Sequence, residues 1–117
     1  MPLTILIVDD HAGFRRSARM LLSAEGFDVV GDAGDGASGL TAARQLRPQV
    51  VLLDIQLPDI DGFAVAGIMA AADPDVAIIL ISSRDVASYG SQLEGAPVRG
   101  FIPKGRLDGA TIRGLMR

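Results

Sequence analysis

Short apolar runs alternate five times with longer, half-polar segments along the chain. The runs are rich in β-branched residues, and each is shorter than an ordinary helix. Runs of this kind are typical of strands that are buried on both faces of a parallel sheet. We predict five strands, which cover Thr4 to Val8, Phe27 to Gly31, Val50 to Leu53, Val76 to Ile81 and Arg99 to Ile102.

The segments between these runs carry apolar residues at helical spacing. The first is amphipathic and ends at Gly26, because glycine favours a helix C-terminus. Three further helices are predicted from about Ala37 to Leu46, from about Phe63 to Ala72 and from near Leu107 onward. Asp61 lies near the start of one of them, where a carboxylate complements the helix dipole. The helix predicted from Asp85 to Leu93 should have low stability, because it contains a glycine and several small polar residues.

The order of these elements predicts one α/β domain. Each segment between two strands is long enough to hold the crossover helix that parallel strands require. The expected fold is a doubly wound, five-stranded parallel sheet with helices on both faces. In such sheets, ligands bind outside the carboxyl ends of the strands, beside the point where the strand order reverses. Functional side chains are expected there.

The composition agrees with a single domain and argues against several kinds of function. The chain has 117 residues, 49% of them hydrophobic, and a formal net charge of -3. This weak negative charge argues against nucleic-acid binding by the chain itself, because phosphate backbones attract clustered Lys and Arg. Cysteine is absent, in agreement with the reducing cytoplasm in which we expect the protein to act. No apolar run approaches the length of a membrane span.

Three carboxylates follow two of the predicted strands. Asp9 and Asp10 follow the first strand and Asp54 follows the third, so they share one cleft if these strands are neighbours. Anions this close repel one another and require either protons or a cation. A set of oxygen ligands favours Mg²⁺. The alternative is that each aspartate only caps the turn or helix that follows it.

A hydroxyl and an ammonium group are predicted at the same edge of the sheet. The fourth run is followed by Ser82, and Lys104 comes just after the fifth. Together with the carboxylates, these groups suit a phosphoryl group attached to an aspartate, because a metal ion and a lysine would neutralise the phosphoryl oxygens. Taken alone, Ser82 would be an ordinary loop serine and Lys104 a solvated charge.

With these motifs in order, the chain resembles a response regulator receiver domain over essentially all of its length. The motifs are Ile7-Val8-Asp9-Asp10-His11, the ten residues from Leu53 to Gly62, Ile81-Ser82-Ser83 and Phe101-Ile102-Pro103-Lys104. The chain departs from the commonest family pattern at two positions. Ser82 stands where threonine is more frequent, and Gly105 stands where many receivers have proline.

The resemblance implies a phosphorylation site. Asp54 would be the phosphoacceptor, and a sensor histidine kinase would supply the phosphoryl group from a phosphohistidine. Asp10, Asp54 and the backbone carbonyl of Gln56 would bind Mg²⁺. Asp9 would act through a water molecule on the metal.

The resemblance also implies a conformational switch. Ser82 matches the position that bonds a phosphoryl oxygen, Lys104 matches the lysine of the family, and Phe101 matches its aromatic switch residue. Phosphorylation would draw Ser82 and Phe101 inward and repack the face formed by the fourth helix, fifth strand and fifth helix. A partner or a second copy of the chain would bind that face. Gln56 and Arg84 would flank the path of attacking water.

Family membership would fix the strand order as 2-1-3-4-5 in a flavodoxin-like (βα)5 fold. The residues of the motifs resemble those of receivers that are fused to a LuxR-type DNA-binding output domain. We therefore interpret residues 1–117 as one receiver domain, which is either a fragment of a longer protein that continues beyond Arg117 or a single-domain protein. DNA binding would belong to that output domain, and no membrane partner is expected. Beyond its own phosphoryl transfer and autodephosphorylation, the chain is not expected to be an enzyme.

Two other functions remain open from the sequence. An aspartate-nucleophile phosphohydrolase would need the same groups, but Gln56 stands where such an enzyme has a second aspartate, and the chain has no cap domain. A receiver-like interaction module with little phosphorylation is the other alternative, and the complete acidic set argues against it.

Two weaker signals lie close to the acidic residues. Arg15, Arg16 and Arg19 form a basic face on the first helix, which is either a solvated surface or a docking surface for the kinase. His11 could bind a metal, although a histidine that begins a helix is usually solvated.

Overall fold

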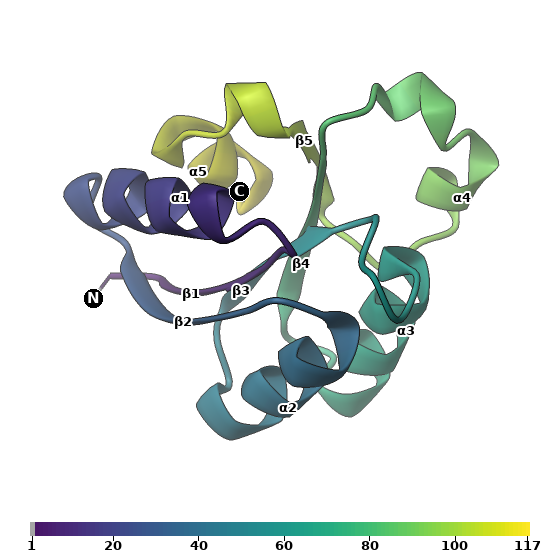
Figure 1. The fold of residues 1–117 in the computed structure, drawn as a ribbon, viewed down its shortest axis with the longest axis horizontal. Coiled ribbons are helices and arrows are strands. Elements are labelled where there is room, and N and C mark those ends of the chain that lie inside the picture. Colours follow the sequence, from purple (N-terminus) through teal and green to yellow (C-terminus); the bar gives the residue numbers. More distant parts are fainter. Residues whose placement is uncertain (1) are drawn as a thin grey trace.

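A computed structural model describes residues 2–117, and its sheet confirms the predicted topology. Five parallel strands lie in the order β2-β1-β3-β4-β5, with helices on both faces (Figure 1). The strands are β1 (Thr4–Val8), β2 (Asp28–Ala33), β3 (Val50–Asp54), β4 (Ala77–Ser82) and β5 (Gly100–Pro103). The helices are α1 (Ala12–Ala24), α2 (Gly36–Leu46), α3 (Gly62–Ala72), α4 (Ser91–Glu94) and α5 (Gly109–Leu115). Two 3-10 turns, η1 (Val86–Ser88) and η2 (Lys104–Arg106), complete the described chain.

The core consists of two apolar layers, one on each face of the sheet. Alternate residues of β1 enter opposite layers, so Ile5 and Ile7 pack on the side of α1 and α5, whereas Leu6 and Val8 pack on the side of α3. Every residue of β3 and β4 is buried. Each large apolar side chain buried in this way contributes about 1.5–3 kcal/mol. The central strands therefore form a rigid support for the residues at their carboxyl ends.

The connection between β3 and α3 is packed tightly against the end of β3. Asp61 lies at the start of α3, as predicted, and its side chain caps the helix by accepting a hydrogen bond from the Phe63 backbone N–H at 2.7 Å. The Gly62 N–H donates to the Ile55 carbonyl oxygen at 2.8 Å. A Cβ atom at Gly62 would lie only 2.5 Å from the carbonyl oxygen of Asp54. A glycine at this position therefore lets α3 approach the backbone that carries Asp54.

The prediction of one helix from Asp85 to Leu93 is wrong. The structure has the short turn η1 and the single-turn helix α4 instead, and between them Gly90 adopts a positive φ of 52°. No residue from 83 to 99 is buried. Without a buried apolar face, tertiary packing does not support a longer helix. The segment is therefore attached to the domain by few contacts.

The end of β2 and the start of α5 each differ from the sequence prediction by two residues. β2 extends past the predicted end at Gly31, because it pairs along the whole of β1. α5 begins at Gly109 rather than near Leu107, since η2 precedes it and the Asp108 side chain caps the helix. With these boundaries, none of the helices within residues 2–117 is both long and apolar enough to cross a bilayer.

Candidate functional site

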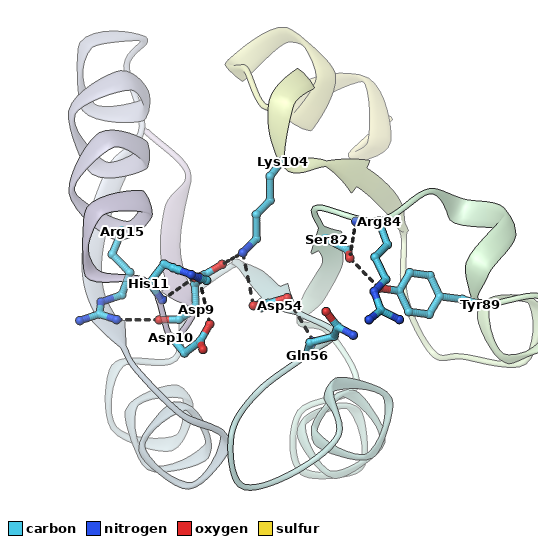
Figure 2. A network of polar contacts seen from close by, with 10 residues as sticks. All are labelled: Asp9, Asp10, His11, Arg15, Asp54, Gln56, Ser82, Arg84, Tyr89 and Lys104. Atoms are coloured by element: carbon cyan, nitrogen blue, oxygen red, sulfur yellow. Dashed lines mark hydrogen bonds and ion pairs between the residues drawn. The ribbon is translucent and has the colours of Figure 1, made fainter.

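Three of the predicted site residues meet at the carboxyl edge of the sheet. β1 and β3 pair in parallel with Val8 opposite Leu53, so Asp9 and Asp54 occupy neighbouring positions. Both are buried, with exposed fractions of 0% and 4%. Lys104 follows β5 and reaches toward the two carboxylates (Figure 2). The expected cleft between the first and third strands is therefore present.

The Lys104 ammonium bridges the two buried carboxylates. Its Nζ lies 2.6 Å from Asp9 Oδ2, 3.4 Å from Asp54 Oδ2 and 4.9 Å from the centre of the Phe14 ring. Burial works against the ammonium charge, but the attraction of the Asp9 and Asp54 carboxylates outweighs it and raises the pKa of Lys104. The lysine is therefore charged at neutral pH and neutralises part of this negative site.

Asp54 is held by one backbone donor and one cation. The Gln56 N–H donates to its Oδ1 at 3.1 Å, while Lys104 contacts its Oδ2. Burial raises the pKa of the Asp54 carboxyl, and the nearby Asp9 charge adds to this rise, although the Gln56 and Lys104 contacts oppose it. A positioned carboxylate next to a cation can act as a nucleophile toward a phosphoryl group.

The acidic residues after β1 offer oxygen atoms suited to a metal ion. Asp9 Oδ1 accepts a hydrogen bond from the His11 N–H at 2.8 Å. Asp9 Oδ2 is buried and has its ion pair with Lys104 but no well-directed hydrogen bond. Ligand atoms of Asp9, Asp10 and His11 lie within 4.8 Å of one another, and the exposed His11 ring is 3.3 Å from Asp10. Two adjacent carboxylates that offer oxygen ligands fit a hard cation such as Mg²⁺.

Ser82 ends β4 at the same edge, but its hydroxyl contacts different groups. Its Oγ accepts a hydrogen bond from the Arg84 backbone N–H at 3.0 Å and lies 2.6 Å from the Tyr89 hydroxyl. Within residues 2–117, no hydrogen bond joins Ser82 to Asp54 or Lys104 (Figure 2). The structure therefore places Ser82 beside the carboxylates without connecting it to them.

Tyr89 is a neighbour of the site that the sequence analysis did not single out. Its ring centroid lies 5.9 Å from that of Phe63 and 6.0 Å from that of Phe101. Phe101, the predicted aromatic switch residue, is half-buried and packs in the same apolar layer. The only signal for Tyr89 in the sequence is an aromatic residue within a stretch of small and polar ones.

The basic face predicted on α1 is partly neutralised within the domain. Arg15 Nη1 donates to the Asp9 carbonyl oxygen at 2.7 Å, and its Nε lies 3.5 Å from Asp32. Arg19 pairs with the same aspartate at 3.2 Å. Only Arg16 is classed as exposed among the three. Arg15 and Arg19 are therefore not freely solvated, and Arg15 supports the backbone of Asp9.

Asp59 has a structural role that the sequence did not reveal. Its Oδ1 accepts a hydrogen bond from the Gly36 N–H at 2.7 Å, and its Oδ2 accepts one from the Ala37 N–H at 3.0 Å. These two hydrogen bonds lower the pKa of the Asp59 carboxyl, and the bond from Gly36 has the larger effect. The loop after Asp54 is thereby tied to the first turn of α2.

The structure thus defines a doubly wound α/β protein with an acidic, lysine-bridged site at the carboxyl edge of its sheet. The family model of the response regulator receiver domain matches residues 5–112. The chain belongs to this family, whose members act in two-component signalling.

Similar proteins support the same assignment. Over 102 residues the chain is 34% identical to the response regulator GacA of Pseudomonas aeruginosa, an alignment that covers 86% of this chain and 48% of GacA. The chain therefore spans about half the length of the curated relatives it matches.

Solved structures extend the comparison to the fold. The receiver domain of the response regulator NarL from Mycobacterium tuberculosis has a TM-score of 0.85 and 28% identity, covering 98% of this chain and 97% of that one. The CheX–CheY complex with BeF3 and Mg²⁺ from Borrelia burgdorferi has a TM-score of 0.81 and 27% identity, covering 99% and 87%.

Proposed function

We propose that this receiver domain is a phosphoacceptor switch in which Asp54 accepts a phosphoryl group from a sensor histidine kinase. An oxygen of the Asp54 carboxylate attacks the phosphorus of a phosphohistidine, the new P–O bond replaces the P–N bond, and the electron pair leaves with the imidazole. The observation that carries this proposal is the buried Asp54 carboxylate at the sheet edge, 3.4 Å from the Lys104 ammonium.

The residues around Asp54 have distinct roles in this step. The Gln56 N–H holds the carboxylate by donating to Oδ1. Lys104 supplies a positive charge for the phosphoryl oxygens that arrive at the site. Asp9 keeps that lysine in place through the 2.6 Å ion pair. The apolar core beneath β1 and β3 prevents these groups from moving apart.

The oxygen ligands of the site suit Mg²⁺, and we assign them to specific residues. Asp10, Asp54 and the carbonyl of Gln56 would hold the ion directly, and Asp9 would act through a water molecule. When bound, the ion neutralises charge that develops on the phosphoryl oxygens. The neighbouring carboxylates of Asp9 and Asp10 at this edge support this assignment.

Ser82 and Phe101 would transmit the conformational change from the site to the surface. We propose that Ser82 bonds a phosphoryl oxygen and that Phe101 follows it, which repacks the surface formed by α4, β5 and α5. A partner or a second copy of the chain would bind there. Arg84 would flank the path of the water that removes the phosphoryl group. Because the curated relatives are about twice as long, we further propose a cytoplasmic protein in which residues 1–117 are one domain and a separate output domain binds DNA.

Intact-protein mass after incubation with acetyl phosphate tests this function. We expect a Mg²⁺-dependent gain of one phosphoryl group in the wild type and in Asp75→Asn, an exposed aspartate that precedes β4 at the opposite edge of the sheet. The Asp54→Asn variant should gain none. No gain under any condition would favour an interaction module, whereas sustained turnover of a small phosphate ester would favour a phosphohydrolase.

A further inference from the structure

Tyr89 is the main attachment of a loosely packed segment to the site. From Ser83 to Gln92 it is the one residue that is not exposed. Its ring lies near Phe63 of α3 and Phe101 of β5, and its hydroxyl lies 2.6 Å from Ser82 Oγ. A single side chain therefore connects this segment to both predicted switch residues, Ser82 and Phe101.

The hydrogen-bonding capacity of Ser82 is limited. A serine hydroxyl has one proton to donate and two lone pairs to accept with. The Arg84 N–H occupies one lone pair, and the Tyr89 hydroxyl takes either the proton or the second lone pair. In both cases Oγ is held next to Tyr89, and Figure 2 draws Asp54 and Tyr89 on opposite sides of it. Movement of Ser82 Oγ toward a phosphoryl group on Asp54 would therefore stretch its contact with Tyr89.

No other hydroxyl from an aromatic residue is available for this role. Tyr89 is the single tyrosine in the chain, and the aromatic residue on β5 is Phe101, which has no hydroxyl. The Phe101 ring instead packs beside Tyr89. The hydroxyl that competes for Ser82 thus comes from the segment after β4 rather than from β5.

We propose that the Tyr89 hydroxyl is a latch that holds Ser82 away from Asp54 in the unphosphorylated protein. A phosphoryl group on Asp54 competes with Tyr89 for a hydrogen bond with Ser82. When Ser82 bonds the phosphoryl group, Tyr89 and the rest of residues 83–92 are released. The latch rests on the proposed phosphorylation of Asp54. It explains how a phosphoryl group on Asp54 can change the order of a segment that has no buried residue. Order in such a weakly held segment is readily shifted by the loss of one contact.

The Tyr89→Phe variant removes the hydroxyl and keeps the ring against Phe63 and Phe101. One hydrogen bond of this kind corresponds to about a fivefold change in an equilibrium. We therefore expect phosphorylation by acetyl phosphate to be about five times faster in Tyr89→Phe than in the wild type. Without any phosphoryl donor, hydrogen exchange of the backbone amides of residues 84–92 should be faster by a similar factor.

Further variants test whether the effect passes through Ser82. In a Ser82→Ala background, Tyr89→Phe should change neither the rate of phosphorylation nor the rate of hydrogen exchange, because the Ser82 hydroxyl that Tyr89 contacts is already absent. Ser83→Ala, which alters an exposed neighbouring serine, should leave the effect of Tyr89→Phe intact. The single tyrosine also makes intrinsic fluorescence a direct probe of Tyr89, since the chain has no tryptophan. Its emission should change when the wild type is phosphorylated and stay constant in Asp54→Asn.

The outcomes separate the latch from the proposed function. If the wild type gains a phosphoryl group while Tyr89→Phe matches it in rate and in hydrogen exchange, the latch is wrong and the phosphoacceptor function stands. If the wild type gains no phosphoryl group, the phosphoacceptor function fails and the latch fails with it as a regulatory device. In that case, faster exchange in Tyr89→Phe would show only that the hydrogen bond stabilises the segment.

Discussion

The Lys104 ammonium lies closer to Asp9 than to Asp54, at 2.6 Å from the first carboxylate and 3.4 Å from the second. Asp9 is completely buried, and Arg15 contacts its carbonyl oxygen rather than its carboxylate. The lysine therefore provides the main counter-charge for a buried anion as well as a cation next to the proposed acceptor. This double role has consequences for stability that are separate from phosphorylation.

Replacing Lys104 with methionine should destabilise the domain in the absence of metal. Methionine keeps most of the aliphatic chain beside Phe14 but leaves Asp9 and Asp54 without their shared cation. Because breaking a buried ion pair leaves an uncompensated charge, we expect a loss of about 2–3 kcal/mol in the free energy of unfolding. Urea unfolding in the presence of a chelator would measure it. The control Arg106→Met, at an exposed position two residues away, should have little effect, and equal stability of the two variants would contradict this role.

Asp10→Asn should weaken Mg²⁺ binding. Asp10 contributes a carboxylate to the acidic cluster, and an amide oxygen is a poorer ligand for a hard cation. We expect the dissociation constant, measured by calorimetric titration, to rise about tenfold or more. Asp75→Asn carries the same change of charge at the opposite edge of the sheet and should bind Mg²⁺ like the wild type. If the dissociation constant of Asp10→Asn equals that of the wild type, Asp10 is not a ligand of the ion.

Asp59→Asn should lower the melting temperature in a pH-dependent manner. The amide keeps one acceptor but places an NH2 group against a backbone N–H of α2, so one of the two capping bonds is lost. The pKa of Asp59 is lowered in the folded protein, so its stabilising contribution is complete above the ordinary pKa that the carboxyl has in the unfolded chain. That contribution is lost as the pH falls through the lower folded pKa.

Thermal unfolding at several pH values tests this prediction. The difference in melting temperature between the wild type and Asp59→Asn should be constant near neutral pH and should shrink in strongly acidic solution. Asp75→Asn, whose side chain caps no helix, serves as the control. A difference that persists unchanged at the lowest pH would show that the carboxylate charge is not its source.

Gly62→Ala and Gly67→Ala should have opposite effects although both lie in α3. A Cβ at Gly62 would lie 2.5 Å from the Asp54 carbonyl oxygen and 2.6 Å from Ile55 Cα, whereas a Cβ at Gly67 would meet nothing within 4 Å. Overpacking should cost the first variant about 1–3 kcal/mol. Better helix propensity should stabilise the second by about 0.5–1 kcal/mol. Urea unfolding measures both, and only Gly62→Ala should also slow phosphorylation, because it displaces the backbone of Asp54.

The sequence by itself determined the sheet and most of the elements around it. Runs such as Val50 to Leu53 are short and apolar without interruption, because β3 is buried on both faces. The position of Asp61 at the start of α3 was predictable because a carboxylate there acts on its own helix end. The positions of Asp9, Asp54 and Lys104 at one edge followed from the parallel topology, since the carboxyl ends of parallel strands meet there.

Only the tertiary structure decided the contacts between residues that are distant in sequence or held by few neighbours. The segment from Asp85 to Leu93 has helical spacing but no buried face, so packing did not complete the helix. Asp59 caps α2 from another loop, and Tyr89 reaches Ser82 only because Phe63 and Phe101 provide a place for its ring. Such contacts depend on the relative positions of whole elements, which local periodicity does not encode.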